Sequence, residues 1–205
     1  MNKRTPAYLV LKSAVLFLSL LCFYPLSATN PQKKEMKELN VKKVSLANVA
    51  VENIPALLDK EKVAFQSINT VNWKAFPYQP EVQFRIAHTD DAILVHYKVK
   101  EASVRAVATG DNGAVWEDAC VEFFSIPAGD GIYYNVECSW ELALVIPYSA
   151  FFKHQITSLD GKTVRANFYK CGDKLQTPHF LSWNPINLEK PNFHCPEFFG
   201  TLNFE

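Results

Sequence analysis

The residues best suited to chemistry lie in one ten-residue stretch, 115–124, which reads VWEDACVEFF. It places Trp116 beside three carboxylates, those of Glu117, Asp118 and Glu122. An aromatic ring can cover the apolar C–H face of a sugar, and a nearby carboxylate can accept hydrogen bonds from the sugar hydroxyls. An exposed edge strand with solvated acids would explain the same residues without a ligand, so this stretch alone leaves both interpretations open.

The second half of the stretch predicts a β-strand. Side chains alternate between the two faces of a strand, so Cys120, Glu122 and Phe124 share one face and Val121 and Phe123 share the other. A carboxylate in so apolar a strand is costly to bury unless it has a partner or faces a ligand. Glu122 is therefore a candidate binding residue.

The first 28 residues have the layout of an export signal. Basic Lys3, Arg4 and Lys12 precede an apolar run at 14–24, and small residues follow as far as Ala28. The run has about a dozen residues, whereas a membrane span needs ~20. We therefore expect cleavage after Ala28 and an exported protein, periplasmic or secreted, with no membrane span once the signal is removed.

Composition limits the partners of the mature chain. Removal of three basic residues with the signal would leave 18 of the 21 basic residues against 21 acidic ones. This balance gives no electrostatic footprint for nucleic acid. The polar, lysine-rich segment 29–43 predicts a flexible lead-in, and residues 44–205 are enough for one domain with a sizeable core.

The cysteines leave several possibilities open. Bulky Leu21 before Cys22 fits poorly with lipoprotein processing. The other four, Cys120, Cys138, Cys171 and Cys195, allow three disulfide pairings, and the sequence cannot choose among them. Their spacing matches no zinc knuckle, so we predict no metal site from it.

Short strands separated by turn residues predict an all-β domain, an antiparallel β-sandwich. Residues 54–60 predict a short helical turn. The expected strands lie at 82–86, 93–99, 105–108, 120–126, 132–146, 164–169, 180–183 and 198–204.

One of these segments is too long for a single strand. At ~3.3 Å per residue, 132–146 would extend about 50 Å, and strands seldom exceed ~10 residues. Either the chain bends sharply at Ser139, or two strands meet there where a connecting loop is expected.

Six pieces in order resemble family 9 carbohydrate-binding modules, nearest the exported branch common in Bacteroidota. The matching pieces are VNW at 71–73 with FPY at 76–78, VWEDACVEFF at 115–124, YYNVE at 133–137, RANFYKCGD at 165–173, SWNP at 182–185 and FHCPEFFG at 193–200. The resemblance implies a DOMON-like β-sandwich that binds carbohydrate, an oligo- or polysaccharide, without catalysis.

The resemblance also implies a site in which two aromatic walls clamp a sugar. Trp116 takes the place of one wall and Glu122 that of an acid that reads hydroxyls. Phe193 stands where relatives usually have a tryptophan, and it offers less stacking area. Trp183 is an alternative second wall, although its strand setting favours a core position.

The chain departs from relatives at Ser139, where they usually carry several tens of further residues. That segment could line the site, so its absence is consistent with a module that has lost its ligand. The family also implies structural calcium as an option. Asp111, Asn112 and Asp130 could supply oxygen ligands.

Two other functions use the same residues. A glycosidase would need paired carboxylates, either Glu122 with Glu137 or Glu117 with Asp118, at ~5–9.5 Å. A structural or protein-interaction module would need none of them. Carboxylates that alternate with apolar residues on strands are usually outward-facing charges, so we predict a non-catalytic carbohydrate-binding module with no cofactor.

Overall fold

The structure, a computed structural model, describes residues 9–10, 35–45, 50–108, 113–139 and 142–205. Strands dominate the described chain, and none of its helices is long and apolar enough to cross a membrane. The strands are β1 (Leu9–Val10), β2 (Glu38–Lys43), β3 (Gln66–Ser67), β4 (Thr70–Val71), β5 (Glu81–His88), β6 (Ala92–Lys100), β7 (Cys120–Ile126), β8 (Tyr134–Ser139), β9 (Leu142–Pro147), β10 (Thr163–Cys171), β11 (Phe180–Ser182) and β12 (Gly200–Phe204). The helical elements are α1 (Ile54–Lys60) and the 3₁₀ turns η1 (Val51–Asn53), η2 (Val115–Glu117), η3 (Tyr148–Ala150) and η4 (Pro196–Phe198).

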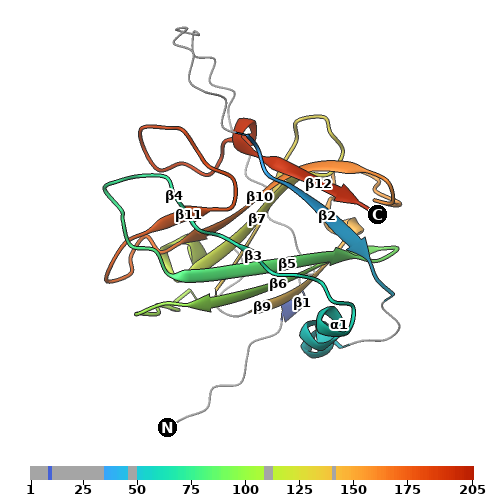
Figure 1. Ribbon diagram of the computed structural model, residues 1–205, viewed down its shortest axis with the longest axis horizontal. Coiled ribbons are helices and arrows are strands. Elements are labelled where there is room, and N and C mark those ends of the chain that lie inside the picture. The colour runs from blue at the N-terminus through green and yellow to red at the C-terminus, as the bar shows by residue number, and fades with distance from the viewer. Residues whose placement is uncertain (1–8, 11–34, 46–49, 109–112, 140–141) are drawn as a thin grey trace, which may run out of the picture.

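The strands form two layers, which we call sheet A and sheet B (Figure 1). Sheet A has β9, β6 and β5 at its centre, with β1 and β3 at its margins. In sheet B the order is β8, β7, β10, and β10 then pairs with β12 along its first half and with β11 at its end. Most pairs are antiparallel, but β1–β9, β12–β2 and β2–β5 are parallel. The expected β-sandwich is thus a mixed one rather than purely antiparallel.

Strand β2 links the two sheets and corrects the expectation of a flexible lead-in through residue 43. Its residues Glu38–Val41 pair with β12, and Lys42 and Lys43 then pair with β5. Val41 is fully buried in the core. The polar composition of this segment did not predict a strand. One buried residue and backbone pairing with both sheets hold it in place.

A hydrophobic core fills the space between the sheets. It contains the inward residues Val121 and Phe123 of β7 and Phe168 of β10, which stacks on Phe84 of β5 with ring centroids 3.6 Å apart. Strand β7 has the bounds and the face alternation that the sequence predicts. The predicted strand at 105–108 is irregular instead, because the carboxylate of buried Asp118 accepts the backbone N–H groups of Val107 and Ala108.

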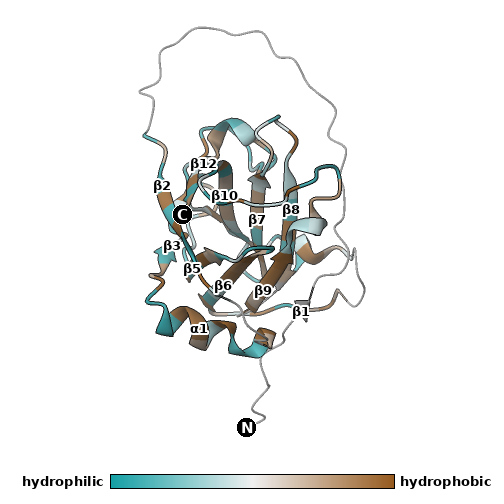
Figure 2. Ribbon diagram, turned by 90° about the vertical axis from the view of Figure 1, so that its right-hand side faces the viewer, coloured by the Kyte–Doolittle hydropathy of each residue, from teal (hydrophilic) through white to brown (hydrophobic). Residues whose placement is uncertain are grey.

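Helix α1 covers the outer face of sheet A (Figure 2). Its buried Ile54 and Leu58 pack on Ala87, Leu94 and Ala143 of β5, β6 and β9. Small alanine side chains let the helix approach the sheet closely. The helix begins and ends at the residues expected from the sequence.

The outer face of sheet B is covered by loops instead of a helix. Aromatic side chains of the segments around 73–76 and 186–199 pack over β7 and β10. This second cluster includes Trp73, Phe124, Tyr169, Phe193 and Phe199. The loops leave part of the sheet uncovered, and the pocket described below lies there.

The long segment 132–146 is two strands that belong to different sheets. Strand β8 ends at Ser139 in sheet B, and β9 begins at Leu142 in sheet A. The chain therefore changes layers where the length argument predicts a bend or a junction. The junction itself, residues 140–141, lies outside the described residues.

Candidate functional site

Three adjacent strands of sheet B place one outward row of side chains across the sheet. Glu122 of β7 lies opposite Glu137 of β8 and opposite Tyr169 of β10. In the next row, Cys120 of β7 lies opposite Cys171 of β10. Side chains directly opposite on neighbouring strands have Cβ atoms about 4.5–5.5 Å apart, so these rows bring acids, thiols and an aromatic ring together.

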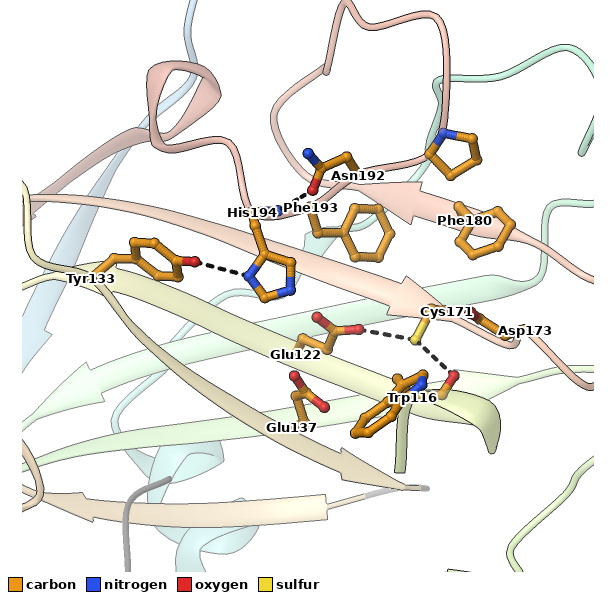
Figure 3. A pocket seen from close by; sticks show the side chains of 11 residues that line it. Trp116, Glu122, Tyr133, Glu137, Cys171, Asp173, Phe180, Asn192, Phe193 and His194 are labelled. Atoms are coloured by element: carbon orange, nitrogen blue, oxygen red, sulfur yellow. Dashed lines mark hydrogen bonds between the residues drawn. The ribbon is translucent and has the colours of Figure 1, made fainter. Parts of the chain in front are cut away.

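A pocket of about 490 Å³ opens above these rows. In Figure 3, Trp116 lies on one side of the carboxylates of Glu122 and Glu137, and Phe193 and Phe180 lie on the other. The full lining is Trp116, Glu122, Tyr133, Glu137, Cys171, Asp173, Phe180, Pro191, Asn192, Phe193 and His194.

Trp116 belongs to η2, just before β7, and its side chain is 40% exposed. Its backbone carbonyl accepts a hydrogen bond from the thiol of Cys171 at 3.6 Å. Buried Asp118, two residues after it, pairs with Arg105 and accepts the backbone N–H groups of Val107 and Ala108. The indole is therefore held at the pocket by its backbone while its ring remains open to a ligand.

Burial disfavours the ionised form of two acids that line the pocket, Glu122 and Glu137. Burial, followed by the charge of Glu137, raises the pKa of Glu122 to about 8. Burial also raises the pKa of Glu137, against the hydrogen bond that Asn135 Nδ2 donates to its Oε1 at 2.7 Å. In the described part of the chain, Glu122, Glu137 and Asp173 form no salt bridge, so their oxygens remain available to a ligand.

Phe193 lines the pocket, but it is a packed residue and not a free-standing wall. Its ring stacks on Tyr169 with centroids 4.2 Å apart and planes 7° apart, and only 8% of the residue is exposed. Its ring also lies tilted against that of Trp73 and edge-on to that of Phe180. One aromatic wall, Trp116, is thus partly exposed, and the other, Phe193, is fixed by stacking.

Trp183, the alternative second wall, is wrong as a pocket residue. It is 2% exposed and packs between the sheets, edge-on to Phe84 and Phe168. It follows β11 with its ring toward the core because the strand alternation places it on the inner face. The structure therefore brings Trp116, Glu122 and Phe193 together and leaves Trp183 apart.

The alternative acid pair and the calcium ligands have other roles in the structure. Glu117 pairs with Lys174 at 2.7 Å, and neither Glu117 nor Asp118 lines the pocket. Asp130 accepts the backbone N–H of Ile132 and contacts His154 Nε2 at 2.8 Å. The other two calcium candidates, at 111 and 112, lie outside the described residues.

Sequence reasoning missed several lining residues, chiefly Tyr133, Asp173, Phe180 and Asn192. Tyr133 could have been found, since it shares an outward face with Glu137 by period two along β8. Asp173 and Asn192 lie outside strands, where no periodic pattern indicates direction, and Phe180 is the first residue of the short strand β11. His194 also lines the pocket, with its Nδ1 2.9 Å from the Tyr133 hydroxyl.

A β-sandwich with an aromatic-walled, carboxylate-bearing pocket on one outer face defines a ligand-binding module. The chain belongs to carbohydrate-binding family 9, whose sequence profile matches residues 52–139 and 137–204. The two matched segments meet at 137–139, at the end of β8, where the sequence predicts that a segment of relatives is missing.

Solved structures show the same architecture. A provisionally assigned carbohydrate-binding protein from Bacteroides uniformis is 52% identical, with a TM-score of 0.80, over 83% of this chain and 100% of that one. A family 9 module from Caldicellulosiruptor kristjanssonii in complex with glucose is 12% identical, with a TM-score of 0.53, over 82% and 96% of the two chains. A family 9 module from the same organism in complex with cellotriose is 14% identical, with a TM-score of 0.53, over 82% of this chain and 94% of that one. No curated protein matches the chain.

Proposed function

We propose that this protein binds a carbohydrate, without catalysis, in the pocket on the outer face of sheet B. The observation that carries the proposal is the meeting of a 40% exposed residue, Trp116, with the carboxylates of Glu122 and Glu137 in one pocket, where neither acid forms a salt bridge with a described residue. Membership of carbohydrate-binding family 9 supports it.

The residues divide the recognition between them. Trp116 stacks on the C–H face of a sugar ring, and Phe193 limits the pocket on the other side of the carboxylates. Glu122 and Glu137 hydrogen-bond the hydroxyls. Stacking of this kind contributes on the order of 0.5–1.5 kcal/mol beyond area burial, so we expect weak binding, with Kd of ~10⁻⁶ to 10⁻³ M.

Glucose, cellobiose and cellotriose are suitable first ligands, since relatives of this fold bind glucose and cellotriose. Isothermal titration calorimetry of the full chain should give saturable binding for at least one of them. Trp116→Ala should weaken that binding at least tenfold and leave the unfolding temperature unchanged. Phe152→Ala is the matched control, because Phe152 is an exposed aromatic residue that does not line the pocket.

Equal affinity in wild type and Trp116→Ala would contradict the site. Equal loss in both alanine variants would contradict it as well, because a surface aromatic far from the pocket should not matter. Incubation with the same oligosaccharides should release no shorter sugar. Release that is lost in Glu122→Gln would instead favour hydrolysis by the Glu122–Glu137 pair.

A module that has lost its ligand is the second candidate. The observation in its favour is the two-part family match that meets at 137–139. The family resemblance implies that relatives usually carry several tens of further residues at this point. Insertion of that segment from another family member between Ser139 and Trp140 tests it. Sugar binding only by the restored version would assign the loss to the missing segment, and binding by the present chain would dismiss this candidate.

We also infer that the protein is exported, to the periplasm or beyond, through the signal at 1–28. The basic and apolar layout of those residues supports this inference. Expression of the full chain with a C-terminal tag, followed by fractionation and N-terminal sequencing, should give a mature protein that begins near Thr29. A full-length product in the cytoplasm would contradict export.

A further inference from the structure

Two cysteines and one glutamate meet at the floor of the pocket. Sγ of Cys120, a carboxylate oxygen of Glu122 and Sγ of Cys171 all lie within 4.8 Å of one another. All three residues are buried, and the Cys171 thiol donates a hydrogen bond to Glu122 Oε1 at 2.9 Å. Glu122 and Cys171 face the pocket directly (Figure 3).

Strand register produces this cluster. Cys120 and Cys171 lie directly opposite each other on β7 and β10, and Glu122 is two residues along the same outward face of β7. Strand pairs hold such positions rigidly, so the three donor atoms are fixed without any loop. The cysteines are far apart in sequence, which is why their spacing gives no zinc pattern.

The donor set suits a thiophilic divalent cation. Zinc binds thiolates at ~2.3 Å and carboxylates at ~2.0–2.2 Å, so its tetrahedral ligands lie roughly 3.5–4 Å apart, which is compatible with the observed cluster. Calcium and magnesium prefer oxygen ligands only, so the two sulfurs disfavour them. Charge points in the same direction, because no lysine or arginine lines the pocket as the structure describes it.

We propose that Cys120, Glu122 and Cys171 form a binding site for a thiophilic divalent cation of the zinc type. The fourth position of a tetrahedral ion falls to a water in the pocket or to the carboxylate of Glu137, which lies opposite Glu122. Binding releases the two thiol protons and the proton of the Glu122 carboxyl to solvent, so the divalent ion offsets two of the three negative charges formed and a water ligand leaves the site with a net charge of one minus. One Glu122 oxygen is sufficient for the ion.

Burial raises the pKa of Cys120 and of Glu122, and the hydrogen bond with Cys120, followed by burial, raises that of Cys171. The three groups therefore favour their protonated forms when no cation is bound. Buried thiols also pack as small apolar groups, and the remaining two cysteines illustrate that role. Cys138 faces the inter-sheet core, and Cys195 packs in the loop before η4.

Cobalt is the probe, since Co²⁺ bound by thiolates absorbs in the near ultraviolet and shows visible bands when tetrahedral. The full chain, prepared free of metal with a non-thiol reductant, should bind one Co²⁺ with these bands, and Zn²⁺ should displace it. Cys120→Ser and Cys171→Ser should weaken Co²⁺ binding at least tenfold and remove the thiolate band. Glu122→Gln should weaken binding but keep the band.

Cys138→Ser and Cys195→Ser are matched controls that remove a buried thiol elsewhere, and both should bind Co²⁺ as the wild type does. Circular dichroism of every variant checks the fold. No thiolate band in the folded wild type, or an unchanged band in Cys171→Ser, would overturn the proposal. A Cys120–Cys171 disulfide in protein purified without reductant would do the same, because disulfide sulfurs do not hold the ion.

The titration contains no sugar, so its outcome is independent of the proposed carbohydrate binding. Trp116→Ala should bind Co²⁺ normally even where it loses sugar binding. A chain that binds Co²⁺ and no sugar would leave the metal site standing alone, whereas sugar binding without Co²⁺ would remove the metal site only.

Discussion

The two outer faces of the sandwich are covered differently, sheet A by a helix and sheet B by loops. On sheet A, α1 closes the surface, and the buried cation there has partners on every side. Arg85 donates to Asp59 Oδ1 at 2.6 Å, to the Pro55 carbonyl at 2.8 Å and to His96 Nδ1 at 3.1 Å. On sheet B, loops leave a pocket whose carboxylates have no lysine or arginine beside them in the described lining.

The difference separates structural polar groups from functional ones. A buried charge with a full set of partners stabilises the packing of one element on another, as Arg85 does for α1. Buried acids grouped without a cation cost stability, and a protein retains them where a ligand compensates. This criterion supports the proposed binding site on the outer face of sheet B.

The largest effect should follow Arg85→Met, which keeps an apolar stem and removes the guanidinium. Three hydrogen bonds that fasten α1 to the sheet are lost, each worth about 1 kcal/mol net. We expect the free energy of unfolding to fall by about 2–3 kcal/mol in urea denaturation. Sugar affinity should not change in the protein that remains folded, and a large loss of affinity would mean that the two faces are coupled.

His96 on the same face predicts a pH effect. Burial and neighbouring Arg85 lower its pKa from 6.5 to about 4, so the unfolded chain takes up a proton that the folded chain refuses. The free energy of unfolding should therefore fall as pH falls from 6.5 toward 4. His96→Gln keeps an acceptor for Arg85 and should reduce this loss by about 1–2 kcal/mol at pH 5.

The His96→Gln variant should keep part of the acid sensitivity of the wild type. Burial also lowers the pKa of His179 to about 4, at a different place in the fold. Urea denaturation of both proteins at pH 7 and pH 5 gives the comparison. If the free energy of unfolding falls by the same amount between pH 7 and pH 5 in wild type and His96→Gln, His96 is not the group that titrates.

Much of this fold could be predicted from the sequence, because its signals are local. Period-two alternation gave β7 with its correct faces, and the length of 132–146 indicated a junction that divides β8 from β9. Strand β2 was missed because its residues are mostly polar and its pairing partners, β5 and β12, are distant in sequence. The prediction of a strand at 105–108 was wrong because the Asp118 side chain accepts backbone N–H groups that a neighbouring strand would otherwise have paired.

The site was harder to predict, and the reason is register. Trp116 and Glu122 lie close in sequence and could be found together, and Phe193 required the family resemblance. Nothing in the sequence aligns β7 with β10, so the meeting of Cys120 with Cys171 was hidden. Trp183 shows the converse, an aromatic residue of suitable type whose strand face directs it into the core.

A smaller effect of opposite sign should follow Glu137→Gln in the pocket. Burial raises the pKa of Glu137, so its ionised form destabilises the folded state above that pKa. Glutamine keeps an acceptor for Asn135, and we expect a gain of about 0.5–1 kcal/mol in the free energy of unfolding at pH 8. The gain should disappear at pH 4, where the carboxyl is protonated in both states.

Glu61→Gln is the matched control near α1 on the other face. Its carboxylate pairs with Lys42 at 2.9 Å, which lowers its pKa, so its removal should reduce stability slightly at pH 8. The contrast between the faces predicts opposite signs for the two variants. The same sign in both would show that the acids of the pocket are no more strained than surface charges.

The smallest effect should come from Phe193→Trp, which enlarges the fixed wall of the pocket. The ring stacks on Tyr169 and faces a pocket of about 490 Å³, so an indole has a stacking partner and room to extend toward the ligand. We expect sugar affinity to rise two- to threefold, about 0.5 kcal/mol, in the calorimetric titration. Trp183→Phe should lower stability and leave affinity unchanged, because its ring fills the inter-sheet core. Weaker binding by Phe193→Trp would mean that the stacking of Phe193 on Tyr169 determines the shape of the pocket, and that a larger ring there does not add contact with the sugar.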